Sequence, residues 1–185
     1  LWGDDSLRTG DFSGRVGAVL RIYKELRIAA NYSRGFRAPS ITDLGTLGLT
    51  GDGFETDYLS ATALGGTIGS TADAAALNTG LAVTQQRSEV TNNYDFSIRY
   101  GNKRFETEGT FFYIDFQGSI TKQALILPAG SVGRLLGDQP IISQNANGTV
   151  FVALSTSPVL IRANFTGANI YGFEYEAEAK LTRDI

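Results

Sequence analysis

The stretch Tyr171-Gly172-Phe173-Glu174-Tyr175-Glu176-Ala177-Glu178-Ala179-Lys180-Leu181 alternates strictly between two kinds of side chain. One set is aromatic or aliphatic, and the other contains glycine, three glutamates and a lysine. Because successive side chains of a β-strand point to opposite faces, this pattern predicts a strand with one apolar and one charged face. Strands of soluble sheets usually have about five or six residues, and this pattern continues for about ten. That length, with aromatic residues gathered at one end, indicates a transmembrane strand whose charged face lines a wet lumen.

Four earlier segments show a similar alternation. The five expected strands are residues 11–24, 26–35, 88–100, 104–122 and 164–182. We expect tight turns at Lys24-Glu25 and at Gly101-Asn102-Lys103, where glycine and asparagine favour positive φ. The predicted fold class is therefore all-β, an antiparallel transmembrane β-barrel segment of about five strands.

The two faces of these strands should meet different surroundings. The residues expected to point outward, toward lipid, are Val90, Tyr94, Phe96, Ile98, Tyr100, Tyr171, Phe173, Tyr175, Ala177 and Leu181. The residues expected to point into the lumen are Glu89, Asp95, Arg99, Glu106, Glu108, Glu174, Glu176 and Glu178.

Two long connections separate the strand pairs, at residues 36–87 and 123–163. Loops of this length count against an element assignment in a compact domain, but outer-membrane barrels carry long extracellular loops opposite short turns. Because each short turn reverses the chain, both loops should emerge at the same end. We expect a short helix in the first loop, capped by Ser70 and stopped at Gly80, and a strand at residues 149–154 in the second.

Composition excludes several classes of function. The chain has no Cys, Met or His, so it offers no disulfide framework, zinc site, haem ligand or imidazole chemistry, and we expect no catalytic residue, metal or cofactor and no enzyme. Residues 51–57 are rich in oxygen ligands but lack the spacing of an EF-hand. The net charge of −3 gives no electrostatic footprint for nucleic acid. Without an initiator Met or a signal segment, the chain is expected to be an internal piece of a longer polypeptide.

Three segments together resemble one known family. Asn31-Tyr32-Ser33-Arg34-Gly35-Phe36-Arg37-Ala38-Pro39-Ser40-Ile41-Thr42-Asp43-Leu44 resembles the strand-end motif of TonB-dependent outer-membrane receptors, whose characteristic part here is Arg34, Gly35, Phe36, Arg37, Ala38 and Pro39. Residues 88–95 resemble the start of the family's next downward strand, except that Ser88 stands where the family often has Pro. Residues 111–120 resemble its aromatic-rich upward strand.

The resemblance implies that residues 1–185 are part of a barrel wall that the family closes with about 22 strands, with no plug domain in this segment. It implies active uptake of a scarce nutrient, usually an iron–siderophore complex, in the cell outer membrane of a Gram-negative bacterium. The implied partners are outer-membrane lipid, the plug domain of the full-length chain, the TonB complex through parts outside this segment, and a small nutrient ligand such as a ferric siderophore.

The chemistry of the motif also predicts how the strand ends. Pro39 has no N–H for a ladder and biases Ala38 toward an extended conformation, so pairing should stop there. Gly35 permits a bend or bulge just before that point.

Two interpretations of Arg34, Phe36 and Arg37 remain open. In one, the arginines face the barrel interior and contact a plug domain or an anionic ligand, while Phe36 anchors the root of the loop. In the other, the arginines pair with carboxylates of the wall such as Glu89 and only hold the barrel together.

Two other classes of protein also fit parts of the sequence. One is a different outer-membrane barrel, such as a passive porin, an adhesin or a barrel enzyme. The other is a soluble all-β binding domain, although five strands with two long loops make a poor core. A plug-like region upstream of Leu1 would decide for the receptor.

Overall fold

The computed structural model describes residues 10–181. This part of the chain divides into two compact units. The first, called the strand unit, contains residues 10–37, Glu89–Gln117 and residues 167–181. The second, called the loop unit, contains Ala38–Ser88 and Gly118–Thr166. Neither helix in the described residues is long and apolar enough to cross a membrane.

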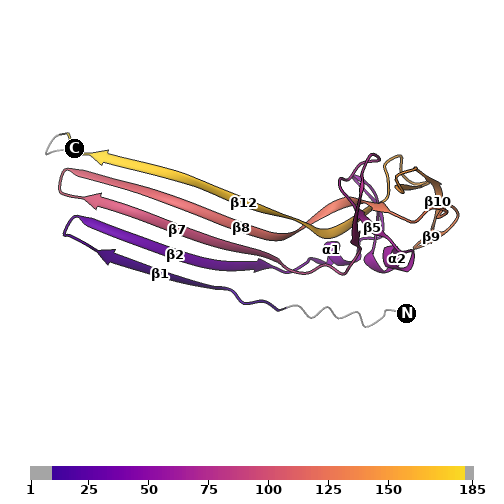
Figure 1. Ribbon diagram of the computed structural model, residues 1–185, viewed down its shortest axis with the longest axis horizontal. Helices are drawn as coiled ribbons and strands as arrows, with labels where there is room; N and C mark the ends of the chain where they lie inside the picture. The colour runs from indigo at the N-terminus through magenta and orange to yellow at the C-terminus, as the bar shows by residue number, and fades with distance from the viewer. Residues whose placement is uncertain (1–9, 182–185) are drawn as a thin grey trace. The chain divides into compact units, whose positions relative to one another are not determined.

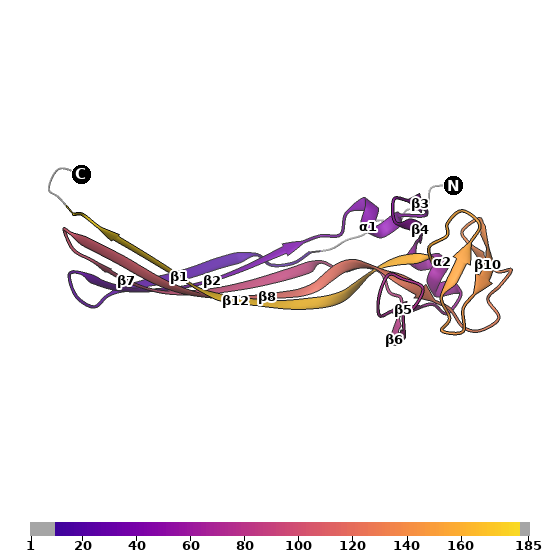
Figure 2. The same ribbon diagram turned by 90° about the horizontal axis from the view of Figure 1, so that it is seen from above.

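Five long strands build the sheet of the strand unit. Their spatial order is β1 (Gly14–Arg21), β2 (Leu26–Arg37), β7 (Glu89–Gly101), β8 (Phe105–Ile126) and β12 (Leu160–Ala179). Neighbouring arrows run in opposite directions in Figure 1, and Figure 2 shows the strands as a single layer. The expected fold class, about five antiparallel strands of a barrel wall, is confirmed, and the sheet is open.

Short turns close both hairpins of the strand unit at one end (Figure 1). Residues 22–25 join β1 to β2 and include the expected Lys24-Glu25. Between β7 and β8, neither Gly101 nor Asn102 adopts a positive φ, so that part of the prediction is wrong. The Asn102 side chain shapes the turn instead, because its Oδ1 accepts the backbone N–H of Phe105 at 2.9 Å.

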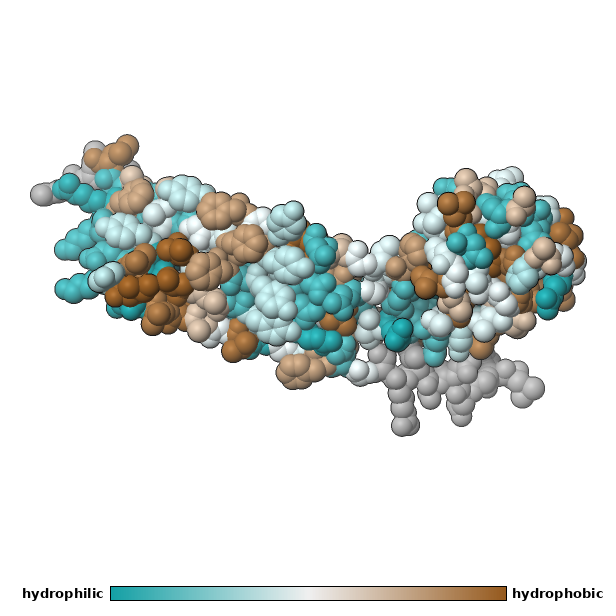
Figure 3. Space-filling view, in the orientation of Figure 1, coloured by the Kyte–Doolittle hydropathy of each residue, from teal (hydrophilic) through white to brown (hydrophobic). Residues whose placement is uncertain are grey.

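The register confirms the predicted alternation of faces in β1, β2, β7 and β8. Ala30 of β2 pairs with Phe96 of β7, which pairs in turn with Phe111 of β8. Residues paired directly across a sheet share a face, so these three side chains lie on one apolar face. The large apolar side chains on this face are exposed, among them Val16, Leu20, Tyr94, Phe96 and Ile98. Figure 3 shows apolar and aromatic side chains standing at the surface of the strands.

The faces of β12 follow from two glycine contacts. A Cβ added to Gly109 would meet the ring of Phe173 at 3.1 Å, and one added to Gly172 would meet the ring of Phe112 at 2.6 Å. Phe173 therefore shares the face of Gly109, which is the apolar face, and the glutamates of β12 lie on the other. The prediction for this strand is confirmed, except that Leu181 follows the end of β12 and its face is not tested.

Tyrosines form a continuous row across the apolar face. Tyr32, Tyr94 and Tyr113 are direct cross-strand partners on β2, β7 and β8. Their ring centroids are 5.0 and 6.0 Å apart, within the range of favourable aromatic contacts. A row of this kind, with a polar tip on every ring, is typical of the aromatic girdle at a membrane surface.

The loop unit contains the remaining elements. They are α1 (Ile41–Gly45), β3 (Gly48–Thr50), β4 (Gly53–Thr56), α2 (Tyr58–Ala63), β5 (Thr67–Gly69), β6 (Asn78–Ala82), β9 (Leu135–Leu136), β10 (Gln139–Gln144) and β11 (Val150–Val152). The unit also includes the ends of β8 and β12 and has its own buried core, with Phe54, Leu125, Leu136, Ile141 and Ile161 among its largest side chains. Both long connections belong to this one unit, which confirms that they emerge together.

The prediction for residues 149–154 is confirmed by β11, which pairs antiparallel with β10. The helix predicted between Ser70 and Gly80 is wrong, because this segment forms turns and then β6. Asp73 accepts the backbone N–H of Ala75 at 2.8 Å, as in a turn, and Ala76 is buried in a small cluster instead of continuing a helix. Tertiary packing therefore overrides the helix propensity of the alanines.

Candidate functional site

The strand-end motif closes β2 as its chemistry predicts. β2 ends at Arg37, two residues before Pro39, and Pro39 itself is buried. Ser40 then caps α1, because its Oγ accepts the backbone N–H of Asp43 at 3.1 Å while its own N–H donates to the Asp43 carboxylate at 2.9 Å. The register of β2 with β7 is unbroken through Gly35, so the permitted bulge does not form.

Arg34 and Arg37 lie on opposite faces of the sheet. Arg37 pairs with Glu89 across β7, and Arg34 pairs with Asn92. In an unbroken strand, residues three positions apart point in opposite directions. The expectation that both arginines face the barrel interior is therefore wrong for one of them. Arg37 shares the polar face with Glu89, and Arg34 continues the face of Tyr32.

Arg37 and Glu89 form an ion pair on the polar face. The distance from Arg37 Nε to Glu89 Oε2 is 2.5 Å. The Glu89 side chain is 9% exposed, whereas half of the Arg37 side chain is exposed. The Arg37 side chain can therefore be reached from the solvent on the polar face.

Arg34 holds the segment that precedes β1. Its Nη1 donates to Asp11 Oδ1 at 2.5 Å and to the carbonyl of Phe12 at 2.5 Å, and its Nη2 donates to Asp11 Oδ2 at 3.2 Å. This two-pronged contact is the geometry in which arginine binds a carboxylate most firmly. Phe36 lies on the same face as Arg34, opposite Val90. Both positions fit a structural role at the end of the wall.

A network of ion pairs in the loop unit was not predicted from the sequence. Glu55 of β4 is 1% exposed, and its carboxylate has three hydrogen-bonding partners. It accepts Arg162 Nε at 2.7 Å, Lys122 Nζ at 2.6 Å and Thr50 Oγ1 at 2.8 Å. Three donors around one buried carboxylate offset the cost of removing its charge from water.

Two further carboxylates extend this network outward. Arg162 Nη1 donates to Asp43 Oδ1 at 3.0 Å, and Lys122 Nζ donates to Asp52 Oδ2 at 2.5 Å. Asp43 belongs to the first turn of α1, directly after the strand-end motif. The network, defined as Asp43, Asp52, Glu55, Lys122 and Arg162, thus joins α1 and β4 to the ends of β8 and β12. The oxygen-rich segment 51–57 uses Asp52 and Glu55 to bind these cations.

Two opposing effects determine the pKa of the Glu55 carboxyl. Burial by itself raises the pKa of the Glu55 carboxyl, and the hydrogen bonds from Arg162, Lys122 and Thr50 lower it by more. The pKa of Glu55 therefore lies below its ordinary value. The exposed Asp52 carboxyl also has a lowered pKa, chiefly because of its hydrogen bond from Lys122. Both groups are charged at neutral pH.

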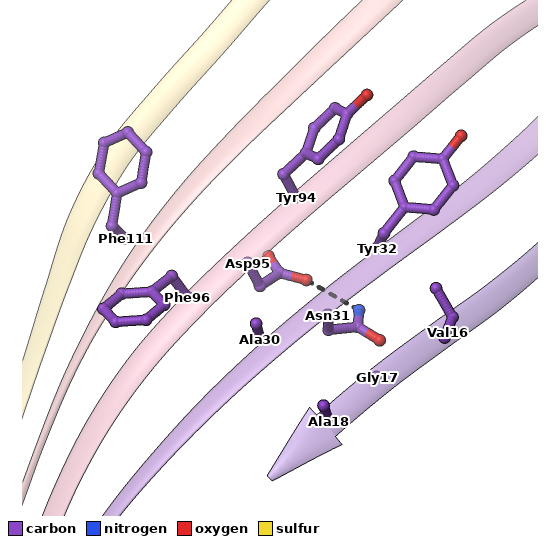
Figure 4. A pocket seen from close by; sticks show the side chains of 10 residues that line it. All are labelled: Val16, Gly17, Ala18, Ala30, Asn31, Tyr32, Tyr94, Asp95, Phe96 and Phe111. Carbon is purple, nitrogen blue, oxygen red and sulfur yellow. Dashed lines mark hydrogen bonds between the residues drawn. The ribbon is translucent and has the colours of Figure 1, made fainter. Parts of the chain in front are cut away.

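A shallow depression of about 400 Å³ lies in the strand unit (Figure 4). Small residues at Gly17, Ala18 and Ala30 leave space between the rings of Tyr32 and Phe96. Its lining is largely apolar, and most of these side chains belong to the apolar face of the sheet. The depression therefore suits contact with lipid and does not suit a polar nutrient.

Comparisons with known proteins place the chain in a family. A family model described as TonB dependent receptor-like, beta-barrel, matches residues 2–183. No curated protein matches the chain. Among solved structures, the siderophore receptor PirA from Pseudomonas aeruginosa is similar, with 16% sequence identity and a TM-score of 0.50. The match covers 94% of this chain and 26% of that receptor, so the chain spans about a quarter of the length of the solved protein.

Proposed function

Because this chain belongs to the family of TonB-dependent receptor β-barrels, we propose that it forms part of the wall and extracellular loops of a receptor for a scarce nutrient, such as an iron–siderophore complex. The family consists of outer-membrane transporters of Gram-negative bacteria, not of enzymes. Family membership also suggests a plug domain, the TonB complex and a siderophore as partners.

One observation carries the proposal beyond family membership. The sheet has an exposed apolar face with a tyrosine row on one side and a face of charged and amide side chains on the other. A sheet in water would have to cover the apolar face, whereas a barrel wall places it in lipid and the polar face in the lumen. This arrangement argues against the soluble binding domain.

Within the proposed receptor, Arg37 is the residue best placed to contact an anionic nutrient or a plug loop. It lies at the end of β2 on the polar face, and half of its side chain is exposed beside Glu89. Arg34 and Phe36 share the opposite face, where we assign them a role in holding the wall.

The test is uptake by the full-length receptor in an iron-limited host that lacks its own siderophore receptors. The proposal expects uptake of at least one of a panel of radiolabelled ferric siderophores, and it expects this uptake to disappear when TonB is deleted. Uptake that persists without TonB would indicate a passive porin instead. If the receptor folds and reaches the outer membrane but transports none of the panel, these siderophores are excluded as its ligands, and other nutrients should be tested.

A further inference from the structure

A short segment of the second long connection binds the backbone of the first. Asn147 Nδ2 donates to the carbonyl oxygens of Ala74 and Ala76, each at 2.9 Å. Thr149 Oγ1 donates to the same Ala74 carbonyl at 3.3 Å, and Asn145 Nδ2 donates to it at 3.5 Å. Residues 145–149, called the clasp, therefore join the two connections, with Asn147 as their main donor.

The Asn147 side chain uses its whole hydrogen-bonding capacity in the clasp. Its Oδ1 accepts the backbone N–H of Thr149 at 3.2 Å, and Thr149 Oγ1 lies 2.9 Å from the same oxygen. The backbone N–H of Gly148 donates to the carbonyl of Asn145 at 2.9 Å. The side-chain amide of Asn147 and the backbone nitrogen that follows it are therefore both engaged with other groups.

The same packing requires glycine at position 148. Gly148 has a φ of +92°, which side chains rarely permit, and a Cβ added there would meet Ile126 Cγ2 at 2.8 Å. Asn147-Gly148 is the one Asn-Gly step in the sequence. Such a step is chemically labile, because glycine has no side chain to hinder the approach of its nitrogen to the side-chain carbonyl carbon of asparagine. The clasp thus contains a labile step that its own geometry imposes.

We propose that Asn147 is a deamidation site that is protected while the clasp is closed and reacts when the clasp opens. The Gly148 nitrogen attacks Asn147 Cγ and forms a new C–N bond. The bond from Cγ to Nδ2 breaks, and Nδ2 leaves as ammonia with the proton of the Gly148 nitrogen. Water then opens the resulting succinimide to aspartate or isoaspartate. The reaction needs no other reactant.

The product of this reaction cannot rebuild the clasp. A carboxylate at position 147 has no N–H to donate, so it would oppose the carbonyl oxygens of Ala74 and Ala76 without a hydrogen atom between them. Isoaspartate also adds a methylene group to the backbone of a turn in which Gly148 is closely packed. Deamidation therefore converts a reversible opening of the clasp into a permanent one.

Peptide mapping of the full-length receptor tests the protection. Folded and urea-unfolded receptor are incubated in heavy-oxygen water and digested in ordinary water, so that mass spectrometry counts only the residues converted during the incubation. Conversion at Asn147 should be at least about tenfold slower in the folded receptor, because the reaction waits for local opening.

Substitutions at Thr149 test whether the clasp provides this protection. Thr149→Val removes the hydroxyl group beside Asn147 Oδ1 and should speed conversion in the folded receptor several-fold, whereas Thr149→Ser should retain the protection. The matched control is Thr46→Val, which removes an exposed hydroxyl that bonds only within its own segment and should change nothing. Heat-modifiable migration on a gel verifies that each variant is folded.

Asn147→Asp installs the product and tests its consequence. The amides of Ala76 and Leu77, which donate within the first connection, should exchange several-fold faster with solvent. Asn145→Asp, which removes only the weaker contact at 3.5 Å, should have a smaller effect. Equal conversion in folded and unfolded receptor, no conversion in unfolded receptor, an unchanged rate in folded Thr149→Val, or unchanged exchange in Asn147→Asp would overturn the proposal. None of these measurements depends on which nutrient the receptor transports.

Discussion

Replacing Glu55 by glutamine should loosen the loop unit while leaving its shape almost unchanged. The substitution keeps the volume of the side chain but removes the charge that Arg162 and Lys122 bind at 2.7 and 2.6 Å. Removing one partner of a buried ion pair costs about 3–5 kcal/mol because the other charge is left uncompensated. Here the two cations are 20% and 27% exposed, and each keeps a second carboxylate, Asp43 or Asp52. We therefore expect a smaller loss, about 2–3 kcal/mol.

Hydrogen exchange of the full-length receptor measures this loss locally. The amides of residues 53–56 and 160–163 should exchange roughly 30- to 150-fold faster in Glu55→Gln, since about 1.4 kcal/mol corresponds to a factor of ten. The control is Asp52→Asn, which disturbs the same Lys122 from a side chain that is 66% exposed. An exposed pair contributes about 0–1 kcal/mol, so this variant should differ little from the natural receptor. Equal and small effects of the two substitutions would refute the view that the network holds the loop unit together.

Three further outcomes are expected. The lowered pKa of Glu55 means that its stabilisation is complete above its ordinary pKa of 4.5 and is lost as the pH falls below that value; amide protection factors in the loop unit, corrected for the intrinsic exchange rate at each pH, should therefore fall with acidification in the natural receptor, and Glu55→Gln should lack this dependence. Ala177→Arg, on the lipid-facing side, should cost on the order of 2–4 kcal/mol in folding into lipid vesicles if it lies near the midplane, and Glu176→Arg should cost much less, so equal costs would contradict a lipid-facing row. Arg37→Ala should reduce nutrient uptake more than it reduces the heat-resistant folded barrel on a gel; the reverse result would show that Arg37 serves only its ion pair with Glu89.

The strands could be predicted from the sequence because their signal is local. A strand exposed to lipid on one side and water on the other alternates at every residue, so the face of Tyr175 or Glu176 is readable without knowing any neighbour. The end of β2 was readable for a similar reason, since Pro39 cannot donate to a ladder.

The ion pairs and the helix positions of the loop unit could not be predicted from the sequence, because they depend on residues far away in the chain. Glu55 and Arg162 are 107 positions apart, and nothing in either local sequence signals the other. The pattern Ser-x-x-Asp occurs at both Ser40 and Ser70, but only Ser40 caps a helix, because packing decides which segment continues. The opposite faces of Arg34 and Arg37 follow from their separation of three residues in a regular strand. A bulge at Gly35 would have changed that relation, and the register shows that no bulge forms there.

The tyrosine row has a consequence for how such a wall assembles. A slip of β7 by one residue against its neighbours would carry Tyr94 to the other side of the sheet and bring Asp95 into the row. In water the misplaced carboxylate would be solvated on either side of the sheet, so its position alone would cost little. In a bilayer the misplaced carboxylate would sit in or near hydrocarbon, at a cost that rises toward the midplane. The membrane therefore selects the correct register of strand pairing, because wrong registers are destabilised before the barrel closes.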